Sequence, residues 1–377
     1  MRSCPRGWRP FILLLSIFVG HRFFLLLFFT DRQVDDQTRV IDYVIQHDIV
    51  RLTTVANNRS TITTISKTMT TRRMTTTKTT TATTTMSPEQ VQEQIYYRRQ
   101  ATIVNPFPYV LVTSPRTACP DGIILVIVVH SHPSYRERRD AIRRTWGRYG
   151  DSQQGEPRLT RLVFALGVDA KVSADAVKAE SGVYDDIIQG NFVDAYKNMT
   201  LKSLLGLKWV SEQCARVPYM LKSDDDMFIS IPYLIDILQT TRPKRSIMGP
   251  FNWHSKVHRR GKWAISKELF PFKWYPAYES GSCYVITVDI VRELYETSAY
   301  VTPLFIDDVY VTGILAKIIG VKHVVHEGFA YWIDRAPKAC DFVTRKKISG
   351  TKVTPKLMYS LWKDMKELTA EKCPTKK

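Results

Sequence analysis

The stretch LKSDDDMFI, Leu221 to Ile229, places three consecutive carboxylates, Asp224, Asp225 and Asp226, between two apolar runs. The residues YMLK, Tyr219 to Lys222, predict a short strand, so the acidic triplet follows at the carboxyl end of that strand. Ligands of open α/β sheets bind at this end, and crowded carboxylates raise each other's pKa unless a cation relieves the repulsion. Taken alone, however, the triplet fits a solvated turn better than a ligand site, so the surrounding sequence decides.

Strand and helix patterns alternate on both sides of the triplet. Further strands are predicted at IILVIVVHS (Ile123 to Ser131), RLVFALG (Arg161 to Gly167), SIMG (Ser246 to Gly249) and Tyr284 to Thr287. Helices are predicted at residues 134–146, 170–180, 200–214, 231–238 and 308–319. This alternation is typical of an α/β domain with a largely parallel sheet, which we place at residues 106–377.

The N-terminus predicts a membrane anchor. Residues 11–29, FILLLSIFVGHRFFLLLFF, have the length of a membrane span, and their apolar residues outweigh the cost of His21 and Arg22. Arginines precede the span and aspartates follow it, so residues 1–10 are expected in the cytosol and the rest of the chain across the membrane. The alternative is a cleaved signal peptide whose apolar core ends at Gly20.

Residues 30–105 predict a disordered stem. Between Thr61 and Thr85, 15 of 25 residues are Thr, which leaves too little apolar surface to offset the ordering entropy. Such stems are typically O-glycosylated, and Asn58 begins an N-glycosylation sequon; an unmodified linker is the alternative.

Charge and cysteines narrow the function classes further. The net charge of +18 favours anionic partners, but a domain beyond a membrane makes nucleic acid an unsuitable one. Five of the six cysteines lie after the span, where disulfides are permitted, so at least one is unpaired or intermolecular.

Six blocks occur in a characteristic order: RRDAIRRTWG (138–147), VFALG (163–167), DAYKNMTLKSLLGLKW (194–209), YMLKSDDDMFI (219–229), YPAYESGSCYVIT (275–287) and IDDVYVTGILAK (306–317). This series resembles the β-1,3-galactosyltransferase and β-1,3-N-acetylglucosaminyltransferase family of the Golgi, over roughly residues 120–375. The resemblance implies a GT-A fold, which is Rossmann-like, in a single-pass type II protein of the Golgi membrane with a luminal catalytic domain.

The resemblance also implies a UDP-sugar donor and a Mn²⁺ ion, with Mg²⁺ as an alternative. Asp226, and with it Asp224, would ligate the metal. Asp224 and Asp225 would contact the donor sugar, its ribose or a metal-bound water. Inverting transfer also needs a general base, and the family's motif aligns that base with Asp308. Asp308 opens a predicted helix, whose dipole favours the ionised carboxylate; a simple N-cap is the alternative.

By the same resemblance, the nucleotide pocket is lined by Arg139, Arg143, Thr145 and Trp146. Arginine pairs with phosphate in bidentate fashion, whereas Trp146 is equally explained as a core residue. Lys202 would reach a phosphate or, as an alternative, face solvent.

On the acceptor side the resemblance implies Tyr278, Ser280 and Gly281, where glycine permits close approach of the backbone to a sugar. The family's Gly-Gly pair is replaced by Ser282 and Cys283, which would narrow the cleft or bring Cys283 into a disulfide.

The sequence leaves the roles of two further positions undecided. Thr351 stands where many family members carry a metal-binding histidine, so either His326, His323 or water fills that place, or metal binding is weakened. Asn198 begins a second sequon, for which a local capping role competes with glycosylation.

The sequence therefore predicts a hexosyltransferase that transfers galactose from UDP-galactose to the 3-hydroxyl of an acceptor sugar with inversion. UDP-N-acetylglucosamine is the alternative donor, and a non-catalytic protein that binds glycans or polyanions is the alternative class. The acceptor would be a glycan on a glycoprotein, glycolipid or glycosaminoglycan. The basic runs HRRGK (258–262) and RKK (345–347) suggest that it is anionic. Dimerisation through the span or a spare cysteine is left open.

Overall fold

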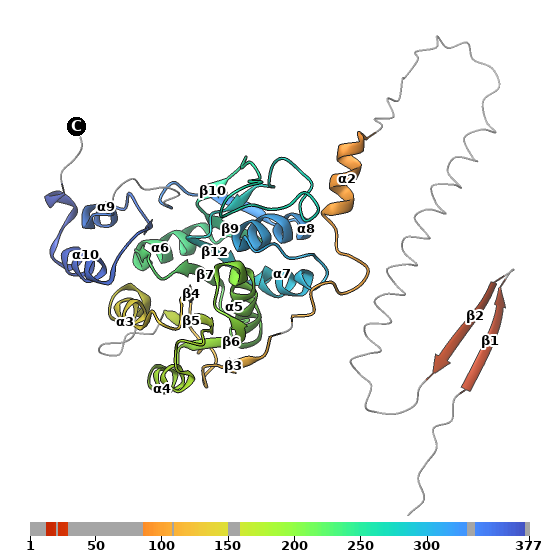
Figure 1. The fold of residues 1–377 in the computed structure, drawn as a ribbon, viewed down its shortest axis with the longest axis horizontal. Coiled ribbons are helices and arrows are strands. Elements are labelled where there is room, and N and C mark those ends of the chain that lie inside the picture. Colours follow the sequence, from red (N-terminus) through yellow and green to blue (C-terminus); the bar gives the residue numbers. More distant parts are fainter. Residues whose placement is uncertain are drawn as a thin grey trace, which may run out of the picture. The chain divides into compact units, whose positions relative to one another are not determined.

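The computed structural model describes residues 13–19, 22–28, 86–107, 109–149, 159–329 and 336–373. The chain divides into two units, Met1–Thr84 and Thr85–Lys377. Every site discussed below lies in the second unit, whose helices surround a central sheet (Figure 1).

The sheet of the second unit has eight strands in the order β13-β9-β12-β7-β4-β5-β6-β3. Strands β7, β4, β5 and β6 run parallel to one another, as the alternation of strands and helices predicts. In contrast, β12 is antiparallel to both β7 and β9, so the sheet is mixed. The strands are β3 (Leu111–Thr113), β4 (Leu125–His130), β5 (Thr160–Val168), β6 (Ile187–Val193), β7 (Tyr219–Asp224), β9 (Ser246–Gly249), β12 (Cys283–Thr287) and β13 (Lys322–Val325).

Two short ladders lie beside the main sheet. One pairs β10 (Phe251–Asn252) with β11 (Tyr278–Glu279), and the other pairs β8 (Phe228–Ile229) with β14 (Ser349–Gly350). The first carries Tyr278 of the site described below, and the second pairs the segment after the acidic triplet with the segment before Thr351.

Helices cover both faces of the sheet. Strand β4 divides its residues between two cores: Val126 and Val128 pack with α5 and α7, and Leu125, Ile127 and Val129 pack with α3, α6 and α10. A strand buried on both faces reads as a continuous apolar run, which is why IILVIVVHS was recognisable. The helices are α2 (Pro88–Tyr96), α3 (Arg136–Arg144), α4 (Ala174–Tyr184), α5 (Met199–Gln213), α6 (Ile231–Thr241), α7 (Val291–Ser298), α8 (Ala316–Ile319), α9 (Ala339–Val343) and α10 (Pro355–Glu367).

The predicted helix at residues 308–319 has an unusual first half. Residues Val309–Leu315 form a π-helix, η4, and only Ala316–Ile319 are α-helical. Short 3₁₀ turns occur at η1 (Trp146–Arg148), η2 (Tyr196–Asn198), η3 (Val288–Ile290) and η5 (Ala370–Lys372). π-Helical turns are rare and are frequent at functional sites, which matches the position of η4 directly after Asp308.

The first unit contains strands β1 (Leu13–Val19) and β2 (Arg22–Phe28), which pair with each other in antiparallel fashion. They stand where we expected a membrane span at residues 11–29. Among the described residues, the structure has no helix with the length and apolar character needed to cross a membrane. The remainder of the predicted span, the cytosolic tail, the Thr-rich run and Asn58 lie outside the described residues.

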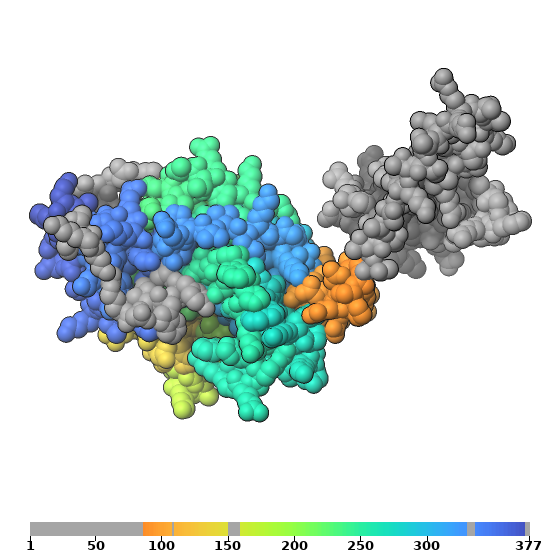
Figure 2. Space-filling view, turned by 90° about the horizontal axis from the view of Figure 1, so that it is seen from above, coloured from red at the N-terminus to blue at the C-terminus, as the bar shows by residue number. Residues whose placement is uncertain are grey.

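We predicted that the domain begins at Pro106. The second unit of the structure begins earlier, at Thr85. Tyr96, at the end of α2, donates a hydrogen bond to the Leu269 carbonyl (2.9 Å) and packs edge-on against Phe270 and Phe272. Lys317 lies 3.8 Å from the ring centre of Tyr97. In the space-filling view the orange atoms of α2 accordingly border teal and blue atoms (Figure 2). Aromatic contacts therefore attach residues 86–105 to the domain.

Two disulfides join the cysteines in pairs that the sequence alone leaves open. Cys119 pairs with Cys214, and Cys340 pairs with Cys373. Of the cysteines described, Cys283 is the free one, and it is buried at the start of β12. Its burial removes it from any disulfide between copies of the folded domain.

Candidate active site

The acidic triplet lies where three strand ends meet. In the register of the sheet, Asp224 of β7 pairs with His130 of β4, and Ser223 pairs with Cys283 of β12. Because β12 runs against β7, its beginning lies beside the end of β7. The residues after β4, the triplet at the end of β7 and the loop before β12 are thus brought to one edge of the sheet.

Asp225 is the buried member of the triplet. Its Oδ2 accepts a hydrogen bond from Ser131 Oγ (2.7 Å), and its Oδ1 accepts one from Arg138 Nη1 (2.8 Å). These bonds fix the carboxylate of Asp225 on the inner side of the edge.

Asp224 is held by a buried lysine. Lys222 Nζ lies 2.8 Å from Asp224 Oδ1 and also donates to the Gly281 carbonyl. Its distance to Asp307 Oδ2 is 3.8 Å. Burial raises the pKa of Asp224 to about 6, with further raising by Asp307 and Asp226 and a lowering effect of Lys222. Burial alone would lower the pKa of Lys222, but Asp224 and Asp307 raise it, so this ammonium stays charged.

Asp226 lies at the partly exposed end of the triplet. Burial and the neighbouring Asp225 raise its pKa, against a lowering effect of Arg138. Its carbonyl accepts a hydrogen bond from Val353 N (2.8 Å). The segment that carries Thr351 therefore runs beside Asp226, where the resemblance places the missing histidine.

The carboxylates of the triplet supply part of the coordination shell that a divalent cation needs. Within the described parts of the chain, no group of three or more His, Cys, Asp or Glu side chains is arranged to hold a metal ion. Mg²⁺-like ions, however, commonly bind through one or two carboxylates, with substrate phosphates and water completing the shell. Asp226 and Asp224, whose pKa values are both raised, offer such a partial set.

Asp308 stands at the N-cap of η4. Its Oδ1 accepts a hydrogen bond from Val309 N (2.8 Å), and its Oδ2 accepts one from Gly281 N (2.7 Å). Burial and the neighbouring Asp307 raise the pKa of Asp308 to about 7, despite these two bonds. We expected the helix dipole to favour ionisation; loss of solvent outweighs it, because a buried carboxylate loses its hydration. A carboxyl that titrates near 7 is well matched to general base catalysis.

A pocket of about 370 Å³ opens beside Asp308. Its lining includes two of the three residues that we predicted on the acceptor side, Tyr278 and Ser280. The third, Gly281, follows directly and bonds to Asp308 through its amide. The pocket is completed by Ser255, Lys256, His258, Trp263, Tyr275, Ile306 and Val309.

The arginines predicted for the nucleotide are paired with protein carboxylates. Arg139 is fully buried and binds Glu180 through two nitrogens (2.7 and 2.8 Å), and it also donates to the carbonyls of His132 and Pro133. Arg143 binds Glu180 and Asp186. Arg139 therefore supports the turn after β4, whereas Arg143 joins α3 to α4 and to the residue before β6. Their contact with a nucleotide stays a prediction, which these pairings do not favour.

Thr145, Trp146 and Lys202 also have internal partners. Thr145 Oγ1 donates to the Ala141 carbonyl (2.7 Å) at the C-terminal end of α3. Trp146 is buried in the core, and its Nε1 donates to the carbonyl of Met227 (3.1 Å), directly after the triplet. Lys202 does not face solvent: its Nζ binds the Ser131 carbonyl (2.7 Å) and Asp194 (2.8 Å). Trp146 and Lys202 therefore support the edge through Met227 and Ser131, whereas the bond of Thr145 stays at the end of α3.

The histidines proposed as replacement ligands have other contacts. His326 Nδ1 accepts a hydrogen bond from Gly328 N (3.0 Å), and the side chain lines a pocket with Tyr233 and Arg345. His323 Nδ1 lies 3.3 Å from Glu279 Oε1. None of these contacts connects either histidine with the triplet.

Asn198, the second sequon, precedes α5. Its side chain makes no capping bond to that helix; its Nδ2 donates instead to the Val193 carbonyl (2.8 Å). The amide nitrogen that would carry a glycan is therefore part of a local contact.

Sequence reasoning missed Arg138, Lys222 and Asp307. A lysine within the apolar strand YMLK was the available signal for Lys222, because buried lysines almost always have a charged partner. Asp307 accepts a hydrogen bond from Ser203 Oγ (2.7 Å), a residue 104 positions earlier. No local pattern distinguishes Arg138 from the arginines on either side of it.

The family model and two of the related proteins that match this chain are all described as galactosyltransferases. The model of a family described as Galactosyltransferase matches residues 137–327. "Beta-1,3-galactosyltransferase 1" of Mus musculus is 30% identical over 276 residues, which are 72% of this chain and 82% of that protein. "Beta-1,3-galactosyltransferase 2" of Homo sapiens is 33% identical over 221 residues, which are 55% of this chain and 50% of that protein.

Among solved structures, the WbbM bifunctional glycosyltransferase matches 56% of this chain and 40% of its own at 12% identity and a TM-score of 0.32, too low to support an argument.

Proposed function

The chain belongs to the galactosyltransferase family, and we propose that it is an inverting hexosyltransferase that forms a β-1,3 linkage from UDP-galactose. The observation that carries this proposal is the connection through Gly281. Its amide bonds to the candidate base Asp308, and its carbonyl accepts from Lys222, which pairs with Asp224 of the triplet. One residue thus links a pocket for an acceptor to an edge suited to a nucleotide sugar, within a proposed GT-A fold.

In the proposed reaction, the acceptor sugar binds in the pocket beside Asp308 with its 3-hydroxyl toward the carboxylate. Asp308 takes the hydroxyl proton as the acceptor oxygen forms a bond to the anomeric carbon of the donor. The bond from that carbon to the phosphate oxygen breaks on the opposite side, and UDP leaves with the electron pair. A single displacement of this kind inverts the configuration. Asp308 then releases the proton to solvent.

The donor side is proposed to use Mn²⁺, or Mg²⁺, with Asp226 and Asp224 as its protein ligands. When bound, such an ion supplies positive charge that stabilises the departing diphosphate. Asp225, fixed by Ser131 and Arg138, would accept hydrogen bonds from the donor sugar or ribose. Burial and Asp225 raise the pKa of Asp226, so a bound cation would stabilise its ionised form.

The proposal also covers the cellular location and membrane topology of the enzyme. We propose a single-pass type II protein of the Golgi membrane, anchored by residues 11–29, with the domain in the lumen. The two disulfides of the second unit agree with an oxidising compartment.

A donor and acceptor screen tests the proposal. The full chain is supplied with Mn²⁺ and, in turn, UDP-galactose, UDP-N-acetylglucosamine and UDP-N-acetylgalactosamine, against several glycan ends. We expect transfer from UDP-galactose that EDTA abolishes and Mn²⁺ restores. Preferred use of another donor would keep the reaction class and correct the sugar. Absence of transfer from all three donors would count against an enzyme.

The matched variant is Asp226→Ala. Because a Lewis acid contributes several kcal/mol to such a reaction, we expect a loss of transfer of more than about a hundredfold. The circular dichroism spectrum and Tm should stay close to those of the parent chain. Unchanged turnover would refute the metal assignment.

A further inference from the structure

Residues 253–277, between β10 and β11, form a basic and aromatic segment. It contains six lysine and arginine residues and a single acid, Glu268. In Figure 1 these residues form the loops that project around β10. The excess of positive charge sets the segment apart from the acidic edge of the sheet.

One of the six cations has a structural role. Arg259 Nη1 donates to the carbonyls of Ile265 and Phe270 (both 2.9 Å), and Nη2 donates to the Phe272 carbonyl (2.7 Å). Arg259 therefore fixes the shape of the loop and is not offered to a ligand. The cations that the loop exposes are Lys256, Arg260, Lys262, Lys267 and Lys273.

Aromatic rings lie among these cations. His254 stacks against Trp274 with ring centres 3.8 Å apart and against Trp253 at 5.0 Å. Trp253 is 75% exposed and Trp263 is 48% exposed. Large apolar rings in solvent mark interaction sites, and the apolar faces of sugar rings pack well on them.

The segment continues into the pocket of the candidate base. Lys256, His258 and Trp263 line the same 370 Å³ pocket as Asp308. Trp263 Nε1 donates to Tyr196 Oη (2.6 Å), and Lys262 Nζ lies 4.1 Å from the ring centre of Tyr196. A sugar chain whose end reaches Asp308 would therefore extend over exposed tryptophans and lysines.

We infer that the acceptor is an oligosaccharide carrying an anionic group, a carboxylate or a sulfate, that pairs with Lys256 and Lys262 while its sugar rings pack on Trp263. This inference rests on the proposed function, because it assigns the acceptor of the same site. Exposed basic residues alone would not explain why Trp263 lines the same pocket as the buried carboxylate of Asp308. A neutral acceptor, in turn, would leave the lysines at the pocket without a partner from the substrate.

The test measures binding directly. Titrations of the full chain follow the fluorescence of the exposed tryptophans with three tetrasaccharides: unsulfated chondroitin, chondroitin 6-sulfate and neutral chitotetraose. We expect the chondroitin oligosaccharides to bind about tenfold more tightly than chitotetraose at low salt, as expected from two partly exposed ion pairs. This preference should fall sharply at about 0.5 M NaCl, because salt screens exposed charges.

Charge-reversal variants test which lysines cause the preference for anionic oligosaccharides. The variant Lys256→Glu/Lys262→Glu should lose it, whereas Lys178→Glu/Lys244→Glu, with the same change of net charge on exposed residues elsewhere, should retain it. Stronger binding of the sulfated form identifies the anion as sulfate, and equal binding identifies it as carboxylate. Equal affinity for chitotetraose, or equal loss in both variants, overturns the inference.

Two further results separate the possible failures. Binding of phosphatidylserine vesicles without any oligosaccharide preference would assign the segment to a membrane surface and also overturn the inference. If the oligosaccharide preference persists but no UDP-hexose is transferred to any acceptor, the proposed function fails and the assignment of the binding surface remains.

Discussion

A side chain at Gly281 would make close contacts with Asp308. A Cβ at this residue would lie 3.1 Å from Asp308 Oδ2 and 3.3 Å from two further atoms of Asp308. Its backbone amide and carbonyl bond to Asp308 and Lys222 respectively. A side chain here would displace the candidate base relative to the donor edge.

Replacement of this glycine therefore tests the connection between the two halves of the site. In Gly281→Ala we expect kcat to fall by up to about tenfold, because Asp308 must move by only a few tenths of an ångström to make room for the methyl group. UDP affinity, measured by calorimetry, should change little. A fall in UDP affinity that matches the fall in kcat would contradict this view.

Asp308 gives the reaction its expected pH dependence. Its raised pKa, about 7, means that the carboxyl is protonated below that pH and cannot accept the hydroxyl proton. With saturating Mn²⁺ and donor, the transfer rate should rise with pH through about 7 and level off above it. The measurement is kcat between about pH 5 and 9, and a rate that is flat down to pH 5 would exclude Asp308 as the base.

The variant Asp308→Asn separates chemistry from binding. We expect UDP binding to be retained and transfer to be lost, because the amide cannot accept the proton. The pH dependence of the residual rate should also lose its limb near 7. Equal losses in UDP affinity and in transfer rate would place Asp308 on the donor side instead.

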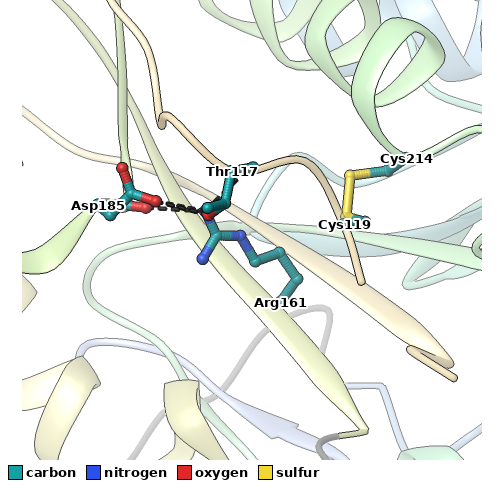
Figure 3. Close-up of a disulfide and its surroundings, with 5 residues drawn as sticks. All are labelled: Thr117, Cys119, Arg161, Asp185 and Cys214. Carbon is teal, nitrogen blue, oxygen red and sulfur yellow. Dashed lines mark hydrogen bonds and ion pairs between the residues drawn. A yellow bond between two sulfur atoms is a disulfide. The ribbon is translucent and has the colours of Figure 1, made fainter. Parts of the chain in front are cut away.

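At the scale of elements, one disulfide lies away from the site. Cys119 precedes β4 and Cys214 follows α5, so the bond lies near the beginning of β4, whereas the triplet lies near its carboxyl end. Figure 3 shows this disulfide together with Thr117, Arg161 and Asp185. Asp185 lies nearby and accepts hydrogen bonds from Arg116 N (2.7 Å) and Thr117 Oγ1 (2.6 Å). Burial alone would raise the pKa of Asp185, but these bonds lower it to about 2. This group of contacts supports stability rather than chemistry.

Removal of this disulfide should therefore affect stability alone. In Cys119→Ser/Cys214→Ser, whose cysteines are 95 positions apart, we expect the free energy of unfolding to fall by about 2–4 kcal/mol. Measured below the lowered Tm, kcat and the donor KM should stay near those of the parent. A large change in kcat without a change in Tm would show that this region communicates with the site.

At the scale of the whole molecule, the domain depends on residues before the predicted boundary. Beyond the aromatic contacts of α2, Gln100 N bonds to the Tyr300 carbonyl (2.9 Å), and Val104 N bonds to the Ala299 carbonyl (2.9 Å). The rings that receive Tyr96 belong to the segment 253–277. The proposed acceptor surface thus rests partly on α2.

A pair of truncated chains tests this dependence. A chain of residues 106–377 should unfold at a lower temperature than one of residues 86–377, because it loses aromatic pairs that contribute about 0.5–1.5 kcal/mol each. It should also bind the acceptor less tightly, since Phe270 and Phe272 lose their cover. Equal Tm values for the two chains would mean that residues 86–105 are only a linker.

Much of the fold could be predicted because its signals are local. Continuous apolar runs identify buried strands such as β4 and β5, and apolar spacing identifies helices such as α5. Strand β6, IIQGNFV, was missed because a glycine and two polar residues interrupt its apolar run. The antiparallel direction of β12 could not be predicted either, because strand direction depends on partners far away in the chain.

The sequence by itself determined the α/β class, the ordered motifs of the family, and the position of the triplet at the end of a strand. Only the tertiary structure decided that Arg138 faces the triplet, that Lys222 joins Asp224 to Gly281, which cysteines pair, and that burial raises the pKa of Asp308. The reason is physical. Backbone preference and apolar periodicity act over a few residues, whereas the pKa and partners of a charged side chain depend on burial by segments dozens of positions away.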